Sequence, residues 1–340
     1  MAEMFLQLKA ADRLDVLGVA ADRLGRPSHL LEKDVWVVWA LEVLFASPVK
    51  DHLVFKGGTS LSKAYGVIDR FSEDVDLTFD IRALVPDLLE GRSDAIPATS
   101  SEERRWSRRV RDVLPIWVAE TVQPMIRAAL GVQGIDARIR LDGEKIFVDY
   151  EPVTRGTGYV SPSVMLEFGA RSTGEPATDR AIFCDADGLV EGVSFPTARP
   201  RVMHAERTFW EKATAIHVFC LQERMRGDRF SRHWHDIARL DAAGIVDIAV
   251  RDHDLAQAVA RHKGMFFAEK AADGRKIDYF AAVNGGLQLV PRGATLDLLA
   301  DDYRRMAEDG LLAAAPEPFE VLMRQCAAIA GRANAERRTT

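Results

Sequence analysis

Hydrophobic positions recur at helical spacing near the start of the chain and again through its last third. Residues 4–24 and 30–46 each place apolar side chains every three or four positions, and the second run is apolar around most of its circumference. A long helix is predicted over 102–130, and further stretches with the same period follow residue 202. Both ends of the sequence are therefore predicted to be helical.

A charged triplet interrupts the second of these helices near its start. Glu32, Lys33 and Asp34 stand in a segment that should otherwise be heavily buried. Acidic side chains in the first turns of a helix are favoured by the helix dipole. That preference explains the two acids of the triplet and leaves Lys33 without an explanation.

Strand patterns fill the middle of the chain. Short alternating or β-branched runs predict strands at 52–56, 74–80, 137–141, 145–151, 163–170 and 180–184. The stretch 86–101, which contains several Pro, Ser and Gly residues, is predicted to be a loop. The order predicts an α+β fold, with a mixed sheet core flanked by helices over 1–200 and a mainly helical domain over 201–340.

Composition narrows the class of protein. The chain has 340 residues, of which 47% are hydrophobic and 28% charged, and its net charge is −6. Three widely separated cysteines without CxxC spacing argue against a disulfide framework or a zinc site. No apolar run is long enough to cross a bilayer, so we expect a cytoplasmic protein without membrane contact.

The acidic net charge argues against a protein that simply coats nucleic acid, so any such contact must use a local patch. The predicted helix over 102–130 carries a candidate, with arginines that repeat at a spacing of four residues and repel one another. An anionic partner such as an RNA backbone would relieve this repulsion, and a solvated helix face is the alternative. The cluster consists of Arg104, Arg105, Arg108, Arg109 and Arg111.

Two aspartates mark the strand 74–80 as a candidate metal site. Residues two apart on a strand point to the same face, so Asp74 and Asp76 share one face while Val75 and Leu77 share the other. Neighbouring carboxylates repel unless a cation lies between them, and Mg²⁺ prefers oxygen ligands and keeps positions open for phosphate oxygens. The pattern predicts a Mg²⁺ site, with Mn²⁺ as the alternative ion.

The loop before this strand supplies groups suited to phosphate. Gly57 and Gly58 allow the backbone to approach a phosphate closely and to present N–H groups. Thr59 and Ser60 can add hydroxyl donors at the start of the next helix. Each signal is weak alone, since such a turn is usually only a helix cap. Together with the acidic pair, the turn favours a triphosphate held beside its metal.

These motifs resemble the AbiEii/AbiGii group of nucleotidyltransferase-like toxins, within the DNA-polymerase-β-type nucleotidyltransferase superfamily. The resemblance runs from about residue 31 to 240 through LEKDVWVVWAL, KGGTSLSKAYG, RFSEDVDL, ERTFWEKATAIH and RHWHDIARL. It implies an abortive-infection toxin that transfers a nucleoside monophosphate from an NTP to an acceptor hydroxyl and releases pyrophosphate. The acceptor it favours is RNA, at the 3′ end of tRNA, and a cognate antitoxin is the implied partner.

The resemblance also assigns residues. The nucleotide-binding set that it implies is Lys56, Gly57, Gly58, Thr59, Ser60, Ser72 and Lys212, and the catalytic set is Asp74, Asp76, Lys212 and Asp236. Lys212 is expected to contact the triphosphate, and Asp236 either orients Lys212 or contacts substrate. Arg70, which precedes the acidic pair, is expected to pair with Asp69 or Glu73.

A third metal-binding carboxylate is usual in this superfamily, on a later strand. Glu167 is the candidate, because Val164, Leu166 and Phe168 alternate to one face and leave it on the other. An ordinary exposed edge position is the alternative interpretation of Glu167. Asp149, on the preceding predicted strand, is the rival carboxylate.

Other functions remain open at this point. The tetrad HWHD, with His204 or His217 upstream and Asp252 or Asp254 downstream, permits a metal phosphohydrolase of the HD type. The fold can also bind nucleotide without turning it over, although binding alone needs fewer acids. A nucleotidyltransferase of this kind can instead modify a protein or a small molecule such as an antibiotic.

Overall fold

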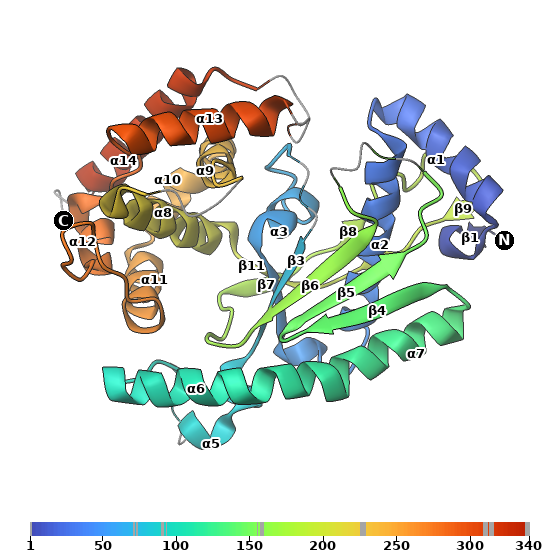
Figure 1. Cartoon of the computed structure of the whole chain (residues 1–340), viewed down its shortest axis with the longest axis horizontal. Helices are drawn as coiled ribbons and strands as arrows, with labels where there is room; N and C mark the ends of the chain where they lie inside the picture. The colour runs from blue at the N-terminus through green and yellow to red at the C-terminus, as the bar shows by residue number, and fades with distance from the viewer. Residues whose placement is uncertain are drawn as a thin grey trace. The chain divides into compact units, whose positions relative to one another are not determined.

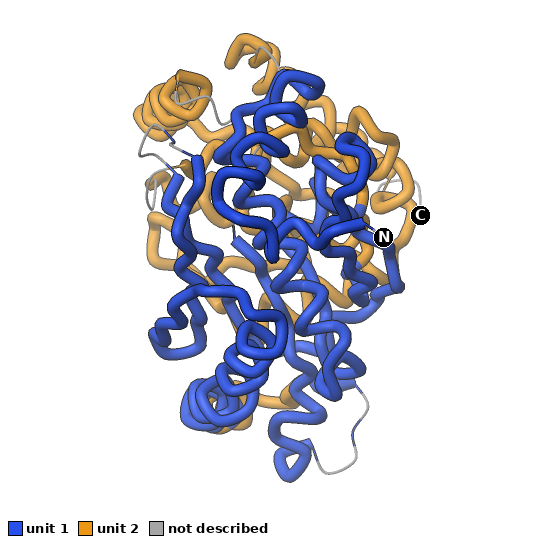
Figure 2. Tube along the Cα trace, turned by 90° about the vertical axis from the view of Figure 1, so that its right-hand side faces the viewer, with its two compact units in different colours: residues 1–64, 72–95, 106–203 blue, residues 65–71, 96–105, 204–340 orange. Residues whose placement is uncertain are grey.

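The computed structural model describes residues 2–336 except for 71, 73, 90–91, 93, 155, 157–159, 225–228, 309–311 and 313–315. Its residues separate into two compact units, coloured in Figure 2. Unit 1 comprises residues 1–64, 72–95 and 106–203, and unit 2 comprises residues 65–71, 96–105 and 204–340. The short segments 65–71 and 96–105 belong to unit 2, although they lie outside the predicted helical domain.

A seven-stranded mixed sheet forms the framework of unit 1 (Figure 1). Its strand order is β4-β5-β6-β3-β2-β11-β7, with β3 parallel to β6 and antiparallel to β2. The strands are β2 (Leu53–Lys56), β3 (Asp74–Phe79), β4 (Ala137–Asp142), β5 (Lys145–Tyr150), β6 (Ser163–Gly169), β7 (Ala177–Asp179) and β11 (Arg201–Met203). Together with the helices, this sheet confirms the predicted α+β class.

Four shorter strands lie outside that sheet. They are β1 (Glu3–Met4), β8 (Ile182–Phe183), β9 (Val193–Ser194) and β10 (Thr197–Ala198). β1 pairs with β9 in parallel, and β10 pairs with β8 in antiparallel orientation. The pairing of β1 holds residues 3–4 extended, which is why the first α-helix begins at residue 10 and not at the predicted residue 4.

The helices of unit 1 follow the predicted order with local differences. They are η1 (Phe5–Gln7), α1 (Ala10–Leu24), α2 (Ser28–Phe45), η2 (Lys50–His52), α3 (Gly57–Lys63), α4 (Ile81–Leu84), α5 (Pro86–Leu89), η3 (Val118–Val122) and α7 (Gln123–Gln133), and α6 (Ser100–Trp117) crosses from unit 2. The predicted loop 86–101 therefore contains one helical turn, α5, which starts at a proline as helices often do. The predicted long helix is interrupted by the π-helical turn η3, between two prolines that lack a backbone N–H.

Helix α2 carries much of the core of unit 1. Its apolar residues are buried almost all round, including Trp36 and Trp39 at 1% exposure each. Trp36 stacks on Tyr150 of β5 with the ring centroids 4.9 Å apart. Burial of large aromatic side chains is among the strongest contributions to a core, so α2 anchors the sheet that presents the candidate site.

Unit 2 is mainly helical, as the periodicity predicts. Its helices are α8 (Ala205–Gln222), α9 (Arg232–Ala242), α10 (Ile245–Arg251), α11 (His253–Phe266), α12 (Tyr279–Ala281), η4 (Ala282–Gly286), α13 (Ala294–Glu308) and α14 (Phe319–Glu336). Two buried indoles fasten it, since Trp210 donates to the carbonyl of Ala249 at 2.9 Å and Trp234 to that of Leu289 at 2.7 Å. Across the described residues of both units, no helix is both long and apolar enough to span a membrane.

Candidate active site

The glycine turn of the predicted phosphate loop lies directly against one of the predicted acids. Gly57 opens α3 with φ at +81°, in the left-handed region that favours glycine. A Cβ atom built on Gly57 would stand 2.0 Å from Oδ2 of Asp76, closer than any real contact. Glycine is therefore favoured here both by its backbone conformation and by the closeness of Asp76, and the turn and the acid share one place in unit 1.

The acidic strand has the faces that its alternation predicts. In β3, Val75 and Leu77 are fully buried, whereas Asp74 and Asp76 are partly exposed on the other face. Among the described residues, no hydrogen bond or ion pair engages the carboxylate of Asp76, although it is partly buried. A partly buried carboxylate of this kind is suited to a cation, because burying a charge without a partner is costly.

The register of the sheet decides which later acid lies nearest. Asp76 is directly opposite Glu167 on β6, so the two side chains share a face one strand apart. The rival, Asp149, is opposite Ser163, four residues earlier on β6, and it is bound to Arg140. The register therefore favours Glu167 over Asp149 as the third carboxylate.

The three predicted metal ligands are not drawn together in this arrangement. The carboxylate of Glu167 lies 3.2 Å from the ammonium of Lys145 on β5. Within the described part of the chain, no group of three His, Cys, Asp or Glu side chains is placed to hold a metal ion. The residues that fit a divalent cation, by oxygen chemistry and shared face, are Asp74, Asp76 and Glu167, with Glu167 turned to Lys145.

The hydroxyls of the loop are occupied inside the protein. Thr59 is buried, donates to the carbonyl oxygen of Asp74, and lies 2.9 Å from the hydroxyl of Ser72. Ser60 is buried as well and donates to the carbonyl of Gly57 at 2.9 Å. In this structure the hydroxyl of Thr59 ties the turn to the acidic strand, and that of Ser60 bonds within the turn. The expected role of Thr59 and Ser60 as phosphate donors stays a prediction. Backbone N–H groups are the remaining donors of the turn.

A buried ionic cluster fixes the helix that follows the turn. Lys63, at the end of α3, pairs with Asp34 of α2 at 2.6 Å and with Asp185 at 2.7 Å. Burial would lower the pKa of Lys63, but the charges of Asp34 and Asp185 raise it above its ordinary value. The helix-dipole explanation of Asp34 is therefore wrong, because its carboxylate binds a lysine and a backbone N–H.

The other members of the charged triplet have the same kind of role. Glu32 accepts hydrogen bonds from the backbone of Val153 at 2.9 Å and from the backbone and hydroxyl of Thr154. Lys33 donates to the carbonyl of Ser161 at 3.1 Å. In the sequence, these buried contacts were indicated by charged residues within a helix that is otherwise apolar on nearly all sides.

In unit 2, the two residues assigned by resemblance form one buried salt bridge. Asp236 on α9 is completely buried and lies 2.9 Å from the ammonium of Lys212 on α8. Arg70 binds the same carboxylate through Nε at 2.6 Å and through a second nitrogen at 2.8 Å. Asp236 is thus a partner of Arg70 that the sequence did not indicate, and Glu73, one of the two acids expected to pair with Arg70, lies outside the described residues.

This geometry indicates what Asp236 does. Burial alone would raise the pKa of Asp236, but Arg70 and Lys212 hold it well below its ordinary value, so the carboxylate stays ionised. Burial lowers the pKa of Lys212, and the charge of Asp236 opposes that effect. A fully buried carboxylate with two cationic partners orients them, which favours the positioning role of Asp236 over substrate contact.

Replacing Asp236 with asparagine is expected to destabilise the protein by about 3–5 kcal/mol at pH 7, because two buried cations lose their counter-charge. The pKa of Asp236 is depressed in the folded state, so its contribution is full above the unfolded value near 3.8 and declines as the pH falls below it. Urea unfolding at pH 7, 5 and 3 should show the difference between wild type and Asp236→Asn narrowing at pH 3.

The matched control is Asp241→Asn on the same helix. Asp241 binds Arg332 and is 24% exposed, so its loss should cost less than about 1 kcal/mol. A difference below 1 kcal/mol for Asp236→Asn at pH 7 would contradict the buried role.

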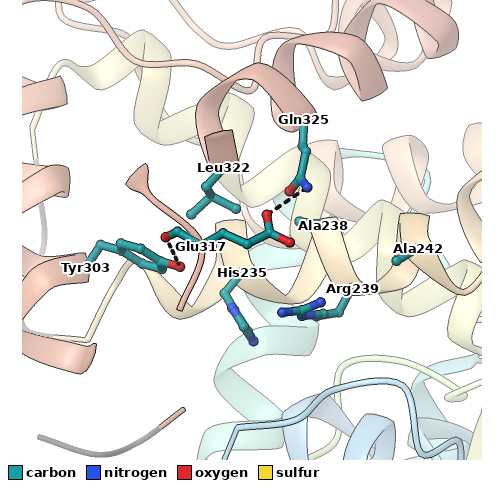
Figure 3. Close-up of a pocket in the computed structure, with 8 residues that line it drawn as sticks. All are labelled: His235, Ala238, Arg239, Ala242, Tyr303, Glu317, Leu322 and Gln325. Carbon is teal, nitrogen blue, oxygen red and sulfur yellow. Dashed lines mark hydrogen bonds between the residues drawn. The ribbon is translucent and has the colours of Figure 1, made fainter. Parts of the chain in front are cut away.

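The face of α9 beside Asp236 lines a small pocket (Figure 3). Its lining residues are His235, Ala238, Arg239, Ala242, Tyr303, Glu317, Leu322 and Gln325. Tyr303 donates to the carbonyl of Glu317 at 3.1 Å, and Gln325 donates to its carboxylate at 2.8 Å. None of the predicted site residues lines this pocket.

Four of the side chains considered for an HD-type hydrolase, Asp236, His235, His217 and Asp252, are engaged elsewhere. Asp236 is bound by two cations, and His235 lies 3.0 Å from Asp69. His217 accepts a hydrogen bond from the backbone of Gln288, and burial lowers its pKa to about 4. Asp252 caps α11. The geometry therefore gives the hydrolase interpretation no support.

Comparison with known proteins agrees with the motifs. Residues 39–325 match the family described as nucleotidyl transferase AbiEii toxin of type IV toxin–antitoxin systems. No curated protein matches the chain. JHP933 from Helicobacter pylori is a similar solved structure, with a TM-score of 0.41 and 16% sequence identity, and the match covers 90% of this chain and 91% of that chain. MenT4, a nucleotidyltransferase toxin from Mycobacterium tuberculosis H37Rv, also has a TM-score of 0.41, with 17% sequence identity, and the match covers 95% of this chain and 99% of that chain. Because the family match covers most of its length, the chain belongs to the AbiEii family of nucleotidyltransferase toxins.

Proposed function

We propose that this toxin transfers a nucleoside monophosphate from an NTP to a hydroxyl at the 3′ end of tRNA, in a Mg²⁺-dependent reaction. The observation that carries the proposal is the contact between Gly57 and the carboxylate of Asp76. A triphosphate that lies along the backbone of the turn would be within reach of a cation held by the acid. A turn that served only as a helix cap would not need such a contact.

Three carboxylates would hold the metal. Asp74 and Asp76 provide oxygen ligands from one face of β3, and Glu167 lies opposite Asp76 on the next strand. Bound Mg²⁺, or Mn²⁺ in its place, would neutralise charge on the phosphate oxygens and favour ionisation of the attacking hydroxyl. The protein itself fixes the distance between the acids and the turn, and position and charge are its main contribution to phosphoryl transfer.

Backbone N–H groups and lysine side chains would bind the phosphates of the nucleotide. The N–H groups of Gly57 and Gly58 and the side chain of Lys56, at the end of β2, are proposed to bind phosphate oxygens. Thr59, Ser60 and Ser72 shape the turn from inside. Lys212 keeps the role that the family resemblance implies, a contact to the triphosphate, with Asp236 as its positioning residue.

The reaction balances as a simple displacement. The acceptor oxygen forms a bond to the α-phosphorus, the bond from that phosphorus to the bridging oxygen breaks, and pyrophosphate leaves with the electron pair. The proton of the acceptor hydroxyl goes to solvent or to a carboxylate of the site. No oxidant or further co-substrate is needed.

An RNA acceptor agrees with the surface of α6. The arginines of the cluster, at positions 104, 105, 108, 109 and 111, are all exposed. Exposed guanidinium groups at this spacing bind a phosphate backbone well and make binding weaker as salt rises. Action on cellular tRNA would place the toxin in the cytoplasm, where the antitoxin of its type IV system would counteract it.

The test is a labelling experiment with an open choice of acceptor. Purified protein is incubated with each NTP labelled at the α-phosphate, Mg²⁺, and total RNA and protein from a bacterial lysate. We expect one band of tRNA size to be labelled, and no label in tRNA whose 3′ end has been oxidised with periodate. Label in a protein or small molecule would overturn the acceptor, and no label with any NTP would overturn the proposed activity.

A further inference from the structure

Four charged side chains cross the sheet of unit 1 in one row, with a lysine at each end and two adjacent carboxylates between them. The register places Lys145 of β5 opposite Glu167 of β6, Glu167 opposite Asp76 of β3, and Asp76 opposite Lys56 of β2. Directly opposed residues point to the same face, and neighbouring strands are about 4.8 Å apart. The carboxylate of Glu167 can therefore turn in two directions on that face. On one side it meets the ammonium of Lys145, and on the other it would meet a cation held beside Asp76.

The pairing within this row is unequal. Glu167 forms an ion pair with Lys145 at 3.2 Å, whereas no described residue binds the carboxylate of Asp76. The side chains of Lys145 and Glu167 are 33% and 42% exposed. An ion pair with that exposure is weak and can open, because water and salt screen it.

We propose that Lys145 is a built-in counter-cation that holds Glu167 away from Asp76 until a divalent cation binds. This inference rests on the proposed function, and it adds a residue that the family motifs do not contain. The ammonium of Lys145 and the metal compete for the same carboxylate. Lys145 therefore weakens metal binding, and the third ligand joins the site only when the cation is present.

Acidic residues in the β4–β5 hairpin lower the free-energy cost of separating Lys145 from Glu167. Burial would lower the pKa of Lys145, but the charges of Glu167, Glu144 and Asp142 raise it above its ordinary value. Glu144 and Asp142 are exposed carboxylates, the first next to Lys145 in the sequence and the second opposite it on β4, so two negative charges remain near the ammonium when Glu167 turns away. The lysine is not left without counter-charge in either state.

The test measures Mn²⁺ binding without nucleotide, by the electron paramagnetic resonance signal of the free ion. In Lys145→Met the competitor is absent, and we expect Mn²⁺ to bind about threefold to tenfold more tightly than in wild type. The matched control is Arg140→Met, which removes one positive charge and one carboxylate ion pair, with Asp149, from the same sheet. Its affinity should equal that of wild type.

Two further variants separate the possible failures. Asp76→Asn should weaken Mn²⁺ binding, and if it binds Mn²⁺ as wild type does, the proposed metal site itself is wrong. In a Glu167→Gln background, Lys145→Met should give a smaller gain, because the ion pair is already absent. If Asp76→Asn loses Mn²⁺ while Lys145→Met binds it as wild type or more weakly, the competition is overturned and the metal site stands.

Discussion

Replacing Asp76 with asparagine is expected to lower nucleotide transfer by about 10³-fold or more while the protein remains folded. The substitution keeps the shape of the side chain and removes the charge that a divalent cation requires. The fold should be spared, because no described residue binds this carboxylate, while Val75 and Leu77 on the other face hold β3 in the core. The measurement is the initial rate of label incorporation, with thermal unfolding measured on the same preparations.

Asp149→Asn is the matched control for this prediction. Asp149 is also an acid on the sheet of unit 1, but it is bound to Arg140 and Ser163 and lies four residues along the strand from the charged row. Its substitution should leave the transfer rate within about threefold of wild type. If Asp76→Asn transfers nucleotide at a rate close to that of wild type, the proposed role of Asp74 and Asp76 in the mechanism is wrong.

A single methyl group on Gly57 is expected to reduce transfer by about 10²-fold or more. The new Cβ would collide with Oδ2 of Asp76, whose carboxylate is the movable end of a side chain. The fold can therefore relieve the collision by turning the carboxylate away from the turn. The stability cost should be limited to about 1–3 kcal/mol for a non-glycine residue at positive φ. Transfer rate and urea unfolding together measure the two effects.

Gly66→Ala separates the contact from the backbone strain. Gly66 has φ at +63°, close to the conformation of Gly57, but a Cβ built there meets nothing within 4 Å. It should lose similar stability and keep most of its activity. Equal loss of activity in both variants would mean that backbone strain, and not the contact with Asp76, accounts for the effect.

Local patterns in the sequence predicted most helices and the strands β2, β3, β4, β5, β6 and β8, but not the short strands β1, β7, β9, β10 and β11. The alternation in 74–80 and 163–170 reports which side chains face the core, because one face of each strand is buried. The alternation therefore placed Asp74, Asp76 and Glu167 on the sides of β3 and β6 where the structure has them. In the last third of the chain, apolar residues at a period of about 3.6 likewise predicted helices.

Long-range contacts could not be predicted in this way. The contact between Gly57 and Asp76 and the pairing of Glu167 with Lys145 depend on strand register, which a single sequence does not specify. Arg70 reaches Asp236 across 166 positions of sequence, a partner that the neighbouring sequence did not indicate. The start of α1 was also missed, because a distant strand, β9, holds residues 3–4 extended.

The central claim is that the glycine turn and the acidic pair form one centre that transfers the α-phosphate of an NTP. The most direct measurement compares two labels of the same NTP, one on the α-phosphate and one on the γ-phosphate, with tRNA as acceptor. We predict that the α-label enters the tRNA and the γ-label leaves as pyrophosphate, and that both outcomes disappear in Asp76→Asn. Transfer of the γ-label, or α-label incorporation that persists in Asp76→Asn, would contradict it.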